Sequence, residues 1–178
     1  MVDIEIMKPQ HLFFMENWHK DDQFMYHICG LKKSMNREEV MTMIQKWITA
    51  GDIPFIVKYN NNPVGYITIR NITPNSSAEI HLALYKNRGI GIMPKALKKV
   101  LDFAFEKVKL HRVCAYLPEY KKGIIKMLKK EPFGLKLEGI MKDALYHDNQ
   151  YKDVYCYATL DKEYKEYAGR TLWAQQLQ

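Results

Sequence analysis

The stretch RGIGIMPKALKKVLDFAFEKVK, from Arg88 to Lys109, is the starting point for interpreting the rest of the chain. Its second part predicts an amphipathic helix, because apolar residues recur every three or four positions. These residues are Leu97, Val100, Leu101, Ala104 and Val108. Pro94 suits the first turn of this helix, where the N–H that proline lacks would have no partner within the helix.

The start of the predicted helix carries none of the usual caps. No Ser, Thr, Asp or Asn lies between Arg88 and Met93, and the first turn holds Lys95 rather than an acid. Gly89 and Gly91 would let a bound group approach the backbone. A helix start of this kind suits an external anion, and we interpret it as a phosphate site. The alternative at this stage is that water satisfies the exposed N–H groups.

Two familiar phosphate-binding loops are excluded by inspection. The chain has no Gly-x-x-x-x-Gly-Lys-Ser/Thr segment, so this is not the loop of the NTPases. The dinucleotide fingerprint would require glycine where Pro94 stands.

The composition predicts a folded domain with an anionic partner. The chain has 178 residues, of which 47% are hydrophobic and 12% aromatic, which argues against disorder. A net charge of +7 and a pI of 9.2 favour a nucleotide cofactor, a nucleic acid or an acidic surface. The lysines between Lys121 and Lys130 are interpreted as a solvated helix face rather than a nucleic-acid arm.

Cysteine and histidine usage predicts a reduced protein with no metal site. Cys29, Cys114 and Cys156 are an odd number without metal-ligand spacing, and the six histidines do not complete a zinc pattern. Reduced thiols fit the cytoplasm. Asp3 and Glu5 interrupt any signal peptide, and no apolar run reaches membrane-spanning length. We therefore expect a soluble, cytoplasmic protein without membrane partners.

The pattern along the chain predicts one α+β domain. A capping box of Asn36 and Glu39 predicts a helix to Ala50 that buries Met41, Ile44 and Ile48, whereas the aromatic run Trp18–Phe24 is assigned to a polar loop. Other helices are expected at Gln10–His19 and Lys121–Lys130, and hairpin turns at Asn60–Pro63 and Asp148–Gln150. Strands are expected at Val2–Met7, Phe55–Tyr59, Val64–Ile72, Ala78–Leu84, His111–Leu117, Leu137–His147 and Tyr151–Leu160.

The central helix separates two predicted strands, Ala78–Leu84 and His111–Leu117. A strand–helix–strand order implies a parallel crossover between these strands. From Asp161 onward the chain is polar, and we expect it to be loosely ordered.

The order of these elements and the amino-acid sequence of the central stretch resemble the GNAT superfamily of acetyl-CoA-dependent N-acetyltransferases over roughly Asp3 to Tyr164. The family's acyl-CoA motif is Gln or Arg, two residues, Gly, one residue, then Gly or Ala; here it reads Arg88-Gly89-Ile90-Gly91-Ile92-Met93. The segment ALKKVLDFAFEKVKLHRVCAYLPE (Ala96–Glu119) is similar to the ribosomal-protein N-terminal acetyltransferase branch, of RimJ/RimL type. So is the ending KLEGIMKDALYHDNQYKDVYCYATL (Lys136–Leu160).

The resemblance implies an α/β/α layered domain over residues 1–164, with a mixed, mostly antiparallel central sheet flanked by helices and a polar tail at 165–178. It also implies an acetyl-CoA site in which the backbone of the motif holds the diphosphate and Arg88 shapes the loop. The strand Ala78–Leu84 would splay from His111–Leu117, and its backbone would bind the pantetheine arm like an added strand. The implied cofactor-binding residues are Leu82, Ala83, Leu84, Arg88, Gly89, Ile90, Gly91, Ile92, Met93 and Tyr120.

The chain departs from the family pattern at Met93, Tyr120 and Met127, and it is a few residues longer than usual near Glu131–Gly134. Met93 stands where the family usually has a small residue, and Tyr120 where an Asn often contacts the cofactor. Met127 falls near the point at which some relatives place a tyrosine that acts as general acid. These departures affect the choice of the acid more than the binding of the cofactor.

Transfer of the acetyl group to an amine requires a base for the ammonium proton and an acid for the departing thiolate. Strand alternation places Glu79 and His81 on one face, and either is a candidate base. Their structural alternatives are a salt bridge for Glu79 and a core histidine for His81. Tyr120 or a hairpin tyrosine such as Tyr146 is the candidate acid, and Cys114 is expected to be a small core residue.

The predicted function is the transfer of an acetyl group from acetyl-CoA to a primary amine, by direct attack with help from a general base. The acceptor stays open between a protein N-terminus, a small amine, an amino-sugar and an aminoacyl group linked to tRNA. His19, Asp21, Asp22 and His27 are expected to attract a cationic amine. The chain is expected to be a monomer or a homodimer. The alternative is a catalytically degenerate protein of the same fold that binds acyl-CoA or nucleic acid.

Overall fold

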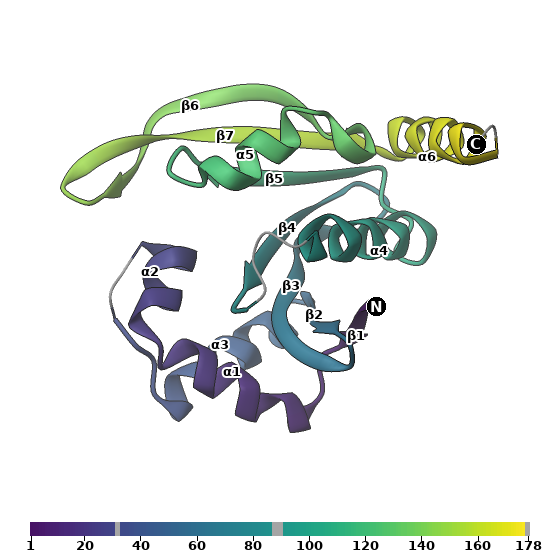
Figure 1. The fold of residues 1–178 in the computed structure, drawn as a ribbon. Coiled ribbons are helices and arrows are strands. Elements are labelled where there is room, and N and C mark those ends of the chain that lie inside the picture. Colours follow the sequence, from purple (N-terminus) through teal and green to yellow (C-terminus); the bar gives the residue numbers. More distant parts are fainter. Residues whose placement is uncertain (31–32, 87–90, 177–178) are drawn as a thin grey trace. The chain divides into compact units, whose positions relative to one another are not determined.

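The computed structural model describes residues 1–30, 33–86 and 91–176, and side chains of the last stretch as far as residue 169. Runs of helices and runs of strands follow one another along the chain, in the α+β manner that the sequence predicts (Figure 1). The elements in chain order are β1 (Val2–Ile6), the 3-10 turn η1 (Pro9–His11), α1 (Leu12–His19), α2 (Asp22–Cys29), α3 (Arg37–Thr49), β2 (Ile53–Tyr59), β3 (Asn62–Thr73), β4 (Ser77–Leu84), α4 (Ile92–Glu106), β5 (Arg112–Pro118), α5 (Lys122–Leu128), the 3-10 turn η2 (Pro132–Gly134), β6 (Lys136–His147), β7 (Gln150–Leu160) and α6 (Asp161–Gln176).

Hydrogen bonds connect the strands in the order β1-β2-β3-β4-β5-β7-β6. The pairs β1–β2, β2–β3, β5–β7 and β6–β7 are antiparallel, whereas β4 and β5 are parallel. The predicted mixed, mostly antiparallel sheet and the predicted crossover are therefore confirmed. The chain divides into two compact units, which are Met1–Ile72 with Ile80–Phe103, and Thr73–Glu79 with Ala104–Gln178. Strand β4 gives its first residues to the second unit and its last residues to the first.

Two asparagine-containing turns close the predicted hairpins. Asn60 and Asn61 both have positive φ, at 48° and 65°, and so do Asp148 and Asn149, at 50° and 58°. Two successive left-handed residues make the type I′ turn, whose twist matches that of the strands on either side. Asn and Asp adopt this conformation more readily than other residues with a side chain. The hairpin positions predicted from the sequence are confirmed.

Helix α3 begins where the sequence predicts but buries another face. The Asn36 side chain accepts a hydrogen bond from the Glu39 amide (2.9 Å), and the Glu39 carboxylate accepts one from the Asn36 amide (2.8 Å). The buried stripe consists of Val40 and Trp47, joined by the partly buried Met43 and Ile44. The prediction for Met41 and Ile48 is wrong, because they are 48% and 57% exposed. The spacing Val40–Met43–Ile44–Trp47 follows the i, i+3, i+4, i+7 rule equally well.

Two helices lie where the sequence analysis expects irregular chain. Asp21 caps α2 by accepting hydrogen bonds from the amides of Gln23 (2.8 Å) and Phe24 (3.0 Å), and Gly30 ends the helix with a φ of 75°. The assignment of this segment to a loop is wrong. The expectation of loose order from Asp161 onward is also wrong, since α6 continues to Gln176.

Helix α4 has the buried side that its period predicts. Leu97, Val100, Leu101 and Ala104 are all buried, whereas Val108 lies beyond the end of the helix and is partly exposed. In the first unit, the Phe103 ring meets the Phe55 ring edge-on at 5.0 Å. The Lys99 ammonium lies 3.1 Å from the Asp3 carboxylate of β1. These contacts attach α4 to the strands of its own unit.

The core of the first unit is an aromatic cluster that surrounds a buried histidine. His19 is fully buried, and its Nδ1 lies 2.7 Å from the Met15 carbonyl oxygen. A carbonyl only accepts, so Nδ1 carries the proton and Nε2 accepts from the Tyr66 hydroxyl at 3.4 Å. The cluster contains Met15, Trp18, Phe24, Val40, Trp47, Ile56, Tyr66 and Ala83. The expectation that His19 attracts an acceptor amine is wrong, because this imidazole is a core group with both nitrogens engaged.

The second unit has its own apolar contacts around β7 and α6. The Phe105 and Tyr164 rings lie 5.2 Å apart, and the Phe133 and Tyr167 rings 5.5 Å apart. The Thr159 hydroxyl donates to the Phe133 carbonyl at 3.1 Å. These contacts attach helix α6 to the end of α4 and to η2, and attach η2 to β7.

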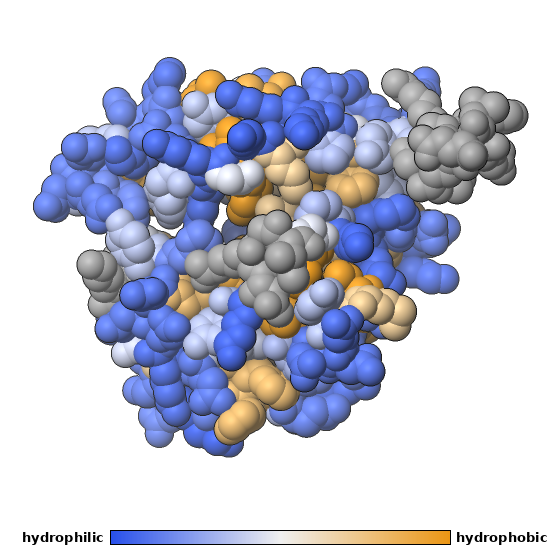
Figure 2. All heavy atoms as spheres, in the orientation of Figure 1, coloured by the Kyte–Doolittle hydropathy of each residue, from blue (hydrophilic) through white to orange (hydrophobic). Residues whose placement is uncertain are grey.

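On the face shown in Figure 2, hydrophilic side chains predominate. Charged residues make up 26% of the sequence, and several exposed cations are paired with acids of the same unit. Of the helices in the described part of the chain, none is long and apolar enough to cross a bilayer.

Strands β3 and β4 approach each other most closely at Gly65. A Cβ built on Gly65 would overlap the Ala83 carbonyl oxygen and would lie 2.8 Å from the Leu84 Cα. Backbone atoms cannot move aside as a flexible side chain can. Only glycine therefore allows this spacing at the end of β4.

We expect Gly65→Ala to lower the free energy of unfolding by about 1–3 kcal/mol, since the added methyl group forces the strands apart. Urea unfolding followed by circular dichroism measures the loss. Gly139→Ala, in strand β6, is the matched control, because no atom lies within 4 Å of the added carbon there. Equal stabilities of the two variants would contradict the close approach.

Burial lowers the pKa of His19 below its ordinary value, although the Met15 carbonyl opposes the shift. The unfolded chain then binds a proton at His19 near pH 6.5, whereas the folded chain does not. We therefore expect this residue to make stability fall as the pH drops below about 6.5, by at most about 1.4 kcal/mol per pH unit.

Unfolding free energies measured between pH 7.5 and pH 5 test this expectation. His19→Asn should be less stable at pH 7.5 but should show a shallower decline than the wild type. His111→Asn, at an exposed position, should keep the wild-type slope. A parallel decline of wild type and His19→Asn would refute the assignment.

Candidate functional site

The start of α4 has the chemistry of an anion site in the residues that the structure describes. Gly91 precedes the helix with a φ of 73°, and no atom lies within 4 Å of the position that its Cβ would take. The first turn contains no acid. Ile92 is buried and Met93 half-buried, whereas Gly91 is exposed. Arg88, Gly89 and Ile90 of the predicted motif lie outside the described residues.

Strand β4 leads toward this helix, and its burial pattern changes along its length. Ala78 and Ile80 are buried with the half-buried Glu79 between them, and His81 is exposed. Beyond His81 the pattern shifts, because Ala83 is buried and its neighbours are half-buried. The alternative of a core histidine at His81 is therefore excluded.

The backbone just after β4 adopts a bulge. The Val64 carbonyl accepts hydrogen bonds from two successive amides, those of Tyr85 (2.8 Å) and Lys86 (3.2 Å). Two residues facing one is the arrangement of a β-bulge, which often lies next to a functional site. The Tyr85 ring stacks on Trp18 at 6.0 Å, and a hydrogen bond to Asp21 contributes to raising the pKa of Tyr85, after the larger effect of burial. The residues predicted to bind the pantetheine arm, Leu82 to Leu84, are therefore followed directly by this bulge.

The parallel ladder between β4 and β5 is short. Its register pairs are Ser77 with Arg112, Ala78 with Val113, and Glu79 with Cys114. Strand β5 continues for four more residues to Pro118, paired there with β7. Glu79 therefore stands beside Cys114 in the last of the three pairs.

A tyrosine that the sequence analysis did not single out belongs to this group. Tyr116 follows Cys114 by two positions on β5, so both side chains lie on the same face as Glu79. The Cys114 thiol donates to the Ala78 carbonyl at 3.5 Å. A signal was present in the sequence, since residues i and i+2 of a strand share a face.

The acidic neighbours of this group shift its proton equilibria. The charge and hydrogen bond of Cys114 raise the pKa of Tyr116, with smaller contributions from burial and Glu79. Burial raises the pKa of Cys114, which agrees with the predicted role as a small core residue. Both groups therefore keep their protons at neutral pH.

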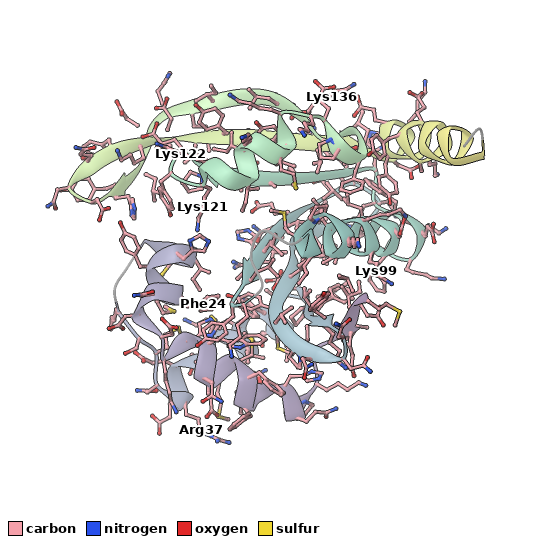
Figure 3. The ribbon with its side chains drawn as sticks, in the orientation of Figure 1. Phe24, Arg37, Lys99, Lys121, Lys122 and Lys136 are labelled. Carbon is pink, nitrogen blue, oxygen red and sulfur yellow. The ribbon has the colours of Figure 1, made fainter. Side chains whose placement is uncertain are left out.

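Tyr120, the predicted acid, lies in an aromatic and cationic setting. Its ring stacks on the buried His147 with centroids 4.1 Å apart, and the Lys121 ammonium lies 5.2 Å from its centroid. Figure 3 shows Lys121 and Lys122 at the start of α5. Tyr146, the other candidate acid, is well exposed and contacts Tyr151 of the same hairpin.

The described residues fit the diphosphate of an acyl-CoA at α4. The left-handed Gly91, the open space around it and the absence of acids in the first turn leave backbone N–H groups for an anion. Among the described residues, no group of three His, Cys, Asp or Glu side chains could hold a metal ion.

Comparison with known proteins identifies the family. The model of the acetyltransferase (GNAT) domain matches residues 6–131, which is more than half of the chain. The protein therefore belongs to the GNAT acetyltransferase family, whose members use acetyl-CoA as the acyl donor.

Two curated relatives come from Bacillus subtilis. YdaF, named provisionally as a ribosomal N-acetyltransferase, is 31% identical over 111 residues, which are 60% of this chain and 58% of YdaF. YnaD, an uncharacterized N-acetyltransferase, is 25% identical over 65% of this chain and 67% of its own. The chain thus spans less than two thirds of YdaF. The YdaF match supports the predicted ribosomal branch.

Two solved structures share the fold. The spermidine N-acetyltransferase of Vibrio cholerae in complex with CoA and spermine has a TM-score of 0.79 at 18% identity, covering 92% of this chain and 97% of that one. A GNAT acetyltransferase of Bacillus anthracis has a TM-score of 0.73 at 22% identity, covering 90% and 95%. At this identity the likeness shows the fold, which confirms the predicted acyltransferase architecture.

We expect Gly91→Ala to weaken acetyl-CoA binding about tenfold, because a side chain in the left-handed region costs about 1–2 kcal/mol and would shift the backbone in front of α4. Isothermal titration calorimetry measures the change. Gly123→Ala, in helix α5 with open space around it, should bind like the wild type. Unchanged affinity of Gly91→Ala would remove Gly91 from the cofactor site.

Proposed function

We propose that this protein transfers the acetyl group of acetyl-CoA to a primary amine. The observation that supports the proposal is the sequence of elements β4, Gly91 and α4 in a chain of the GNAT family. A helix start whose first turn contains no acid binds the diphosphate, and the preceding strand bears the carboxylate and imidazole that proton transfer requires.

The cofactor is held by backbone. The amides from Gly89 to Met93 bind the diphosphate, and Arg88 shapes their loop. The backbone of Leu82, Ala83 and Leu84 extends along the pantetheine arm as an added strand would. Tyr120 contributes its ring to the cofactor side. Backbone N–H groups of β4 stabilise the developing oxyanion.

Glu79 acts as the general base. Its half-buried carboxylate on β4 takes a proton from the acceptor ammonium, directly or through a water, and so produces the neutral amine that attacks the thioester. His81 is the second candidate for this role, because it lies on the same strand and its imidazole is exposed.

The acceptor is a primary amine on a peptide N-terminus, a small molecule, an amino-sugar or an aminoacyl group. The name of YdaF favours a ribosomal protein N-terminus, whereas the solved structure with spermine favours a polyamine. A panel of peptides with free N-termini, together with spermine, glucosamine and an aminoacyl-tRNA, separates these classes when release of free CoA thiol is followed. Mass spectrometry of extracts incubated with the protein and acetyl-CoA identifies the product.

We expect Glu79→Gln to lower kcat/KM about 100-fold at pH 7, since general bases contribute about 10²–10⁴-fold. The deficit should shrink as the pH rises toward the pKa of the acceptor, because the free amine then forms without help. Thiol release as a function of pH measures this, and His81→Ala is assayed beside it.

Glu106→Gln, at an exposed position at the end of α4, is the matched control and should keep wild-type rates. Acetyl-CoA binding without turnover by the wild type, unaffected by Glu79→Gln and His81→Ala, would instead favour a protein that only binds acyl-CoA. Salt-sensitive binding of RNA in place of turnover would favour the nucleic-acid alternative.

A further inference from the structure

We propose that the basic side of helix α5 binds the phosphate backbone of RNA. The surface consists of four exposed lysines, which we call the lysine stripe: Lys122, Lys126, Lys129 and Lys130. All four belong to the second unit. The choice of RNA rests on the proposed function, because two of the acceptors named there, a ribosomal protein N-terminus and an aminoacyl group on tRNA, are carried by RNA.

The stripe occupies one side of the helix, and the residues that the helix buries lie on another. Lys122, Lys126 and Lys129 have the spacing i, i+4, i+7, which brings side chains to one side of a helix. Ile125 and Leu128 are only 7% and 2% exposed. The sequence from Lys121 to Lys130, KKGIIKMLKK, contains no acid. The charged groups of this segment are therefore all positive.

The lysines of the stripe lack the acidic partners that other cations of the second unit have. Lys136 pairs with Glu163 and Lys142 with Asp153, each at 2.7 Å. Lys152 and Lys165 are also paired with acids. Across the described part of the chain, no carboxylate pairs with an ammonium group of the stripe. These four charges are therefore available to an external anion.

The arrangement of charge along α5 is unfavourable in the protein alone. The first turn of the helix contains no acid, and Lys121 at its N-cap makes no side-chain capping hydrogen bond. Lys122 opposes the helix dipole there. Lys126 lies four residues from both Lys122 and Lys130, and like charges at this spacing destabilise a helix. A polyanion bound along the stripe removes this repulsion.

The residue types of the stripe suit a nucleic-acid backbone better than a protein surface. Lysines bind phosphates with release of counterions, whereas lysine is depleted from protein–protein interfaces, whose centres are rich in aromatic residues and Arg. The segment from Lys121 to Lys130 contains no aromatic residue, Arg, Asn or Gln. It therefore lacks the side chains that most often read base edges, and we expect binding to be independent of base sequence.

Fluorescence anisotropy with a labelled, single-stranded RNA of 20 nucleotides tests the stripe. We expect the triple variant Lys122→Gln/Lys126→Gln/Lys129→Gln to bind this RNA about tenfold more weakly at 100 mM salt. The slope of log Kd against log salt concentration should become shallower by about 2, because each phosphate contact on a single strand contributes about 0.7. A second RNA of unrelated sequence should give the same changes.

The matched control removes three exposed lysines from other parts of the chain. Lys46→Gln/Lys107→Gln/Lys162→Gln has the same net charge as the stripe variant and should bind RNA within threefold of the wild type. Equal weakening in both triple variants would overturn the inference, because net charge alone would then account for binding. Equally tight binding of a poly-glutamate peptide to the stripe would also overturn it and would indicate an acidic protein partner.

Two further measurements separate this inference from the cofactor site and from the proposed function. The stripe variant should bind acetyl-CoA like the wild type in calorimetry. Weaker binding of acetyl-CoA with unchanged binding of RNA would overturn the inference and assign the lysines to the cofactor. RNA binding through the stripe without thiol release from any probe amine would overturn the proposed function alone.

Discussion

The close approach of β3 and β4 at Gly65 is the constraint on which the end of β4 depends. With no Cβ at Gly65, the Ala83 carbonyl and the Leu84 backbone lie directly against β3. The Val64 carbonyl then holds the next two amides, so β4 ends in a bulge. The end of the strand thus has a fixed position relative to β3. From there the chain passes to Gly91, whose left-handed backbone begins α4.

The first residues of β4 pair with β5 in the second unit. The three-pair parallel ladder sets Glu79 beside Cys114, and antiparallel pairing with β7 sets the face of Tyr116. Cys114 is a small, buried core residue whose thiol donates to the Ala78 carbonyl.

Strong local signals made most of the fold predictable from the sequence. The capping box at Asn36, the asparagine turns and the apolar stripe of α4 are all encoded within a few residues. The buried face of α3 was mistaken because two stripes fit the same period, and only packing against the rest of the unit selects Val40 and Trp47. Helix α2 was missed because its eight residues are largely polar at the start, although Asp21 and Gly30 mark its two ends.

Some features of the candidate site were predictable from the local sequence, whereas others depend on long-range contacts. Glu79 and His81 could be placed on β4 by alternation, and Gly91 by its motif, because these are local properties. The neighbourhood of Tyr116 depends on which residue of β4 faces which residue of β5, and this register is long-range. The burial of His19 likewise depends on Tyr66, 47 positions away. A charged or aromatic residue shows its chemical type in the sequence, but its partners come only from the folded chain.

Net charge limits what the structural likeness implies for the acceptor. The protein carries +7, with exposed lysines along α5, and its long-range field repels a polycation such as spermine while attracting an acceptor bound to an anionic carrier. The Vibrio cholerae enzyme shares the fold at 18% identity, a level at which the side chains around a pocket are free to differ. Its substrate therefore does not follow from the shared backbone.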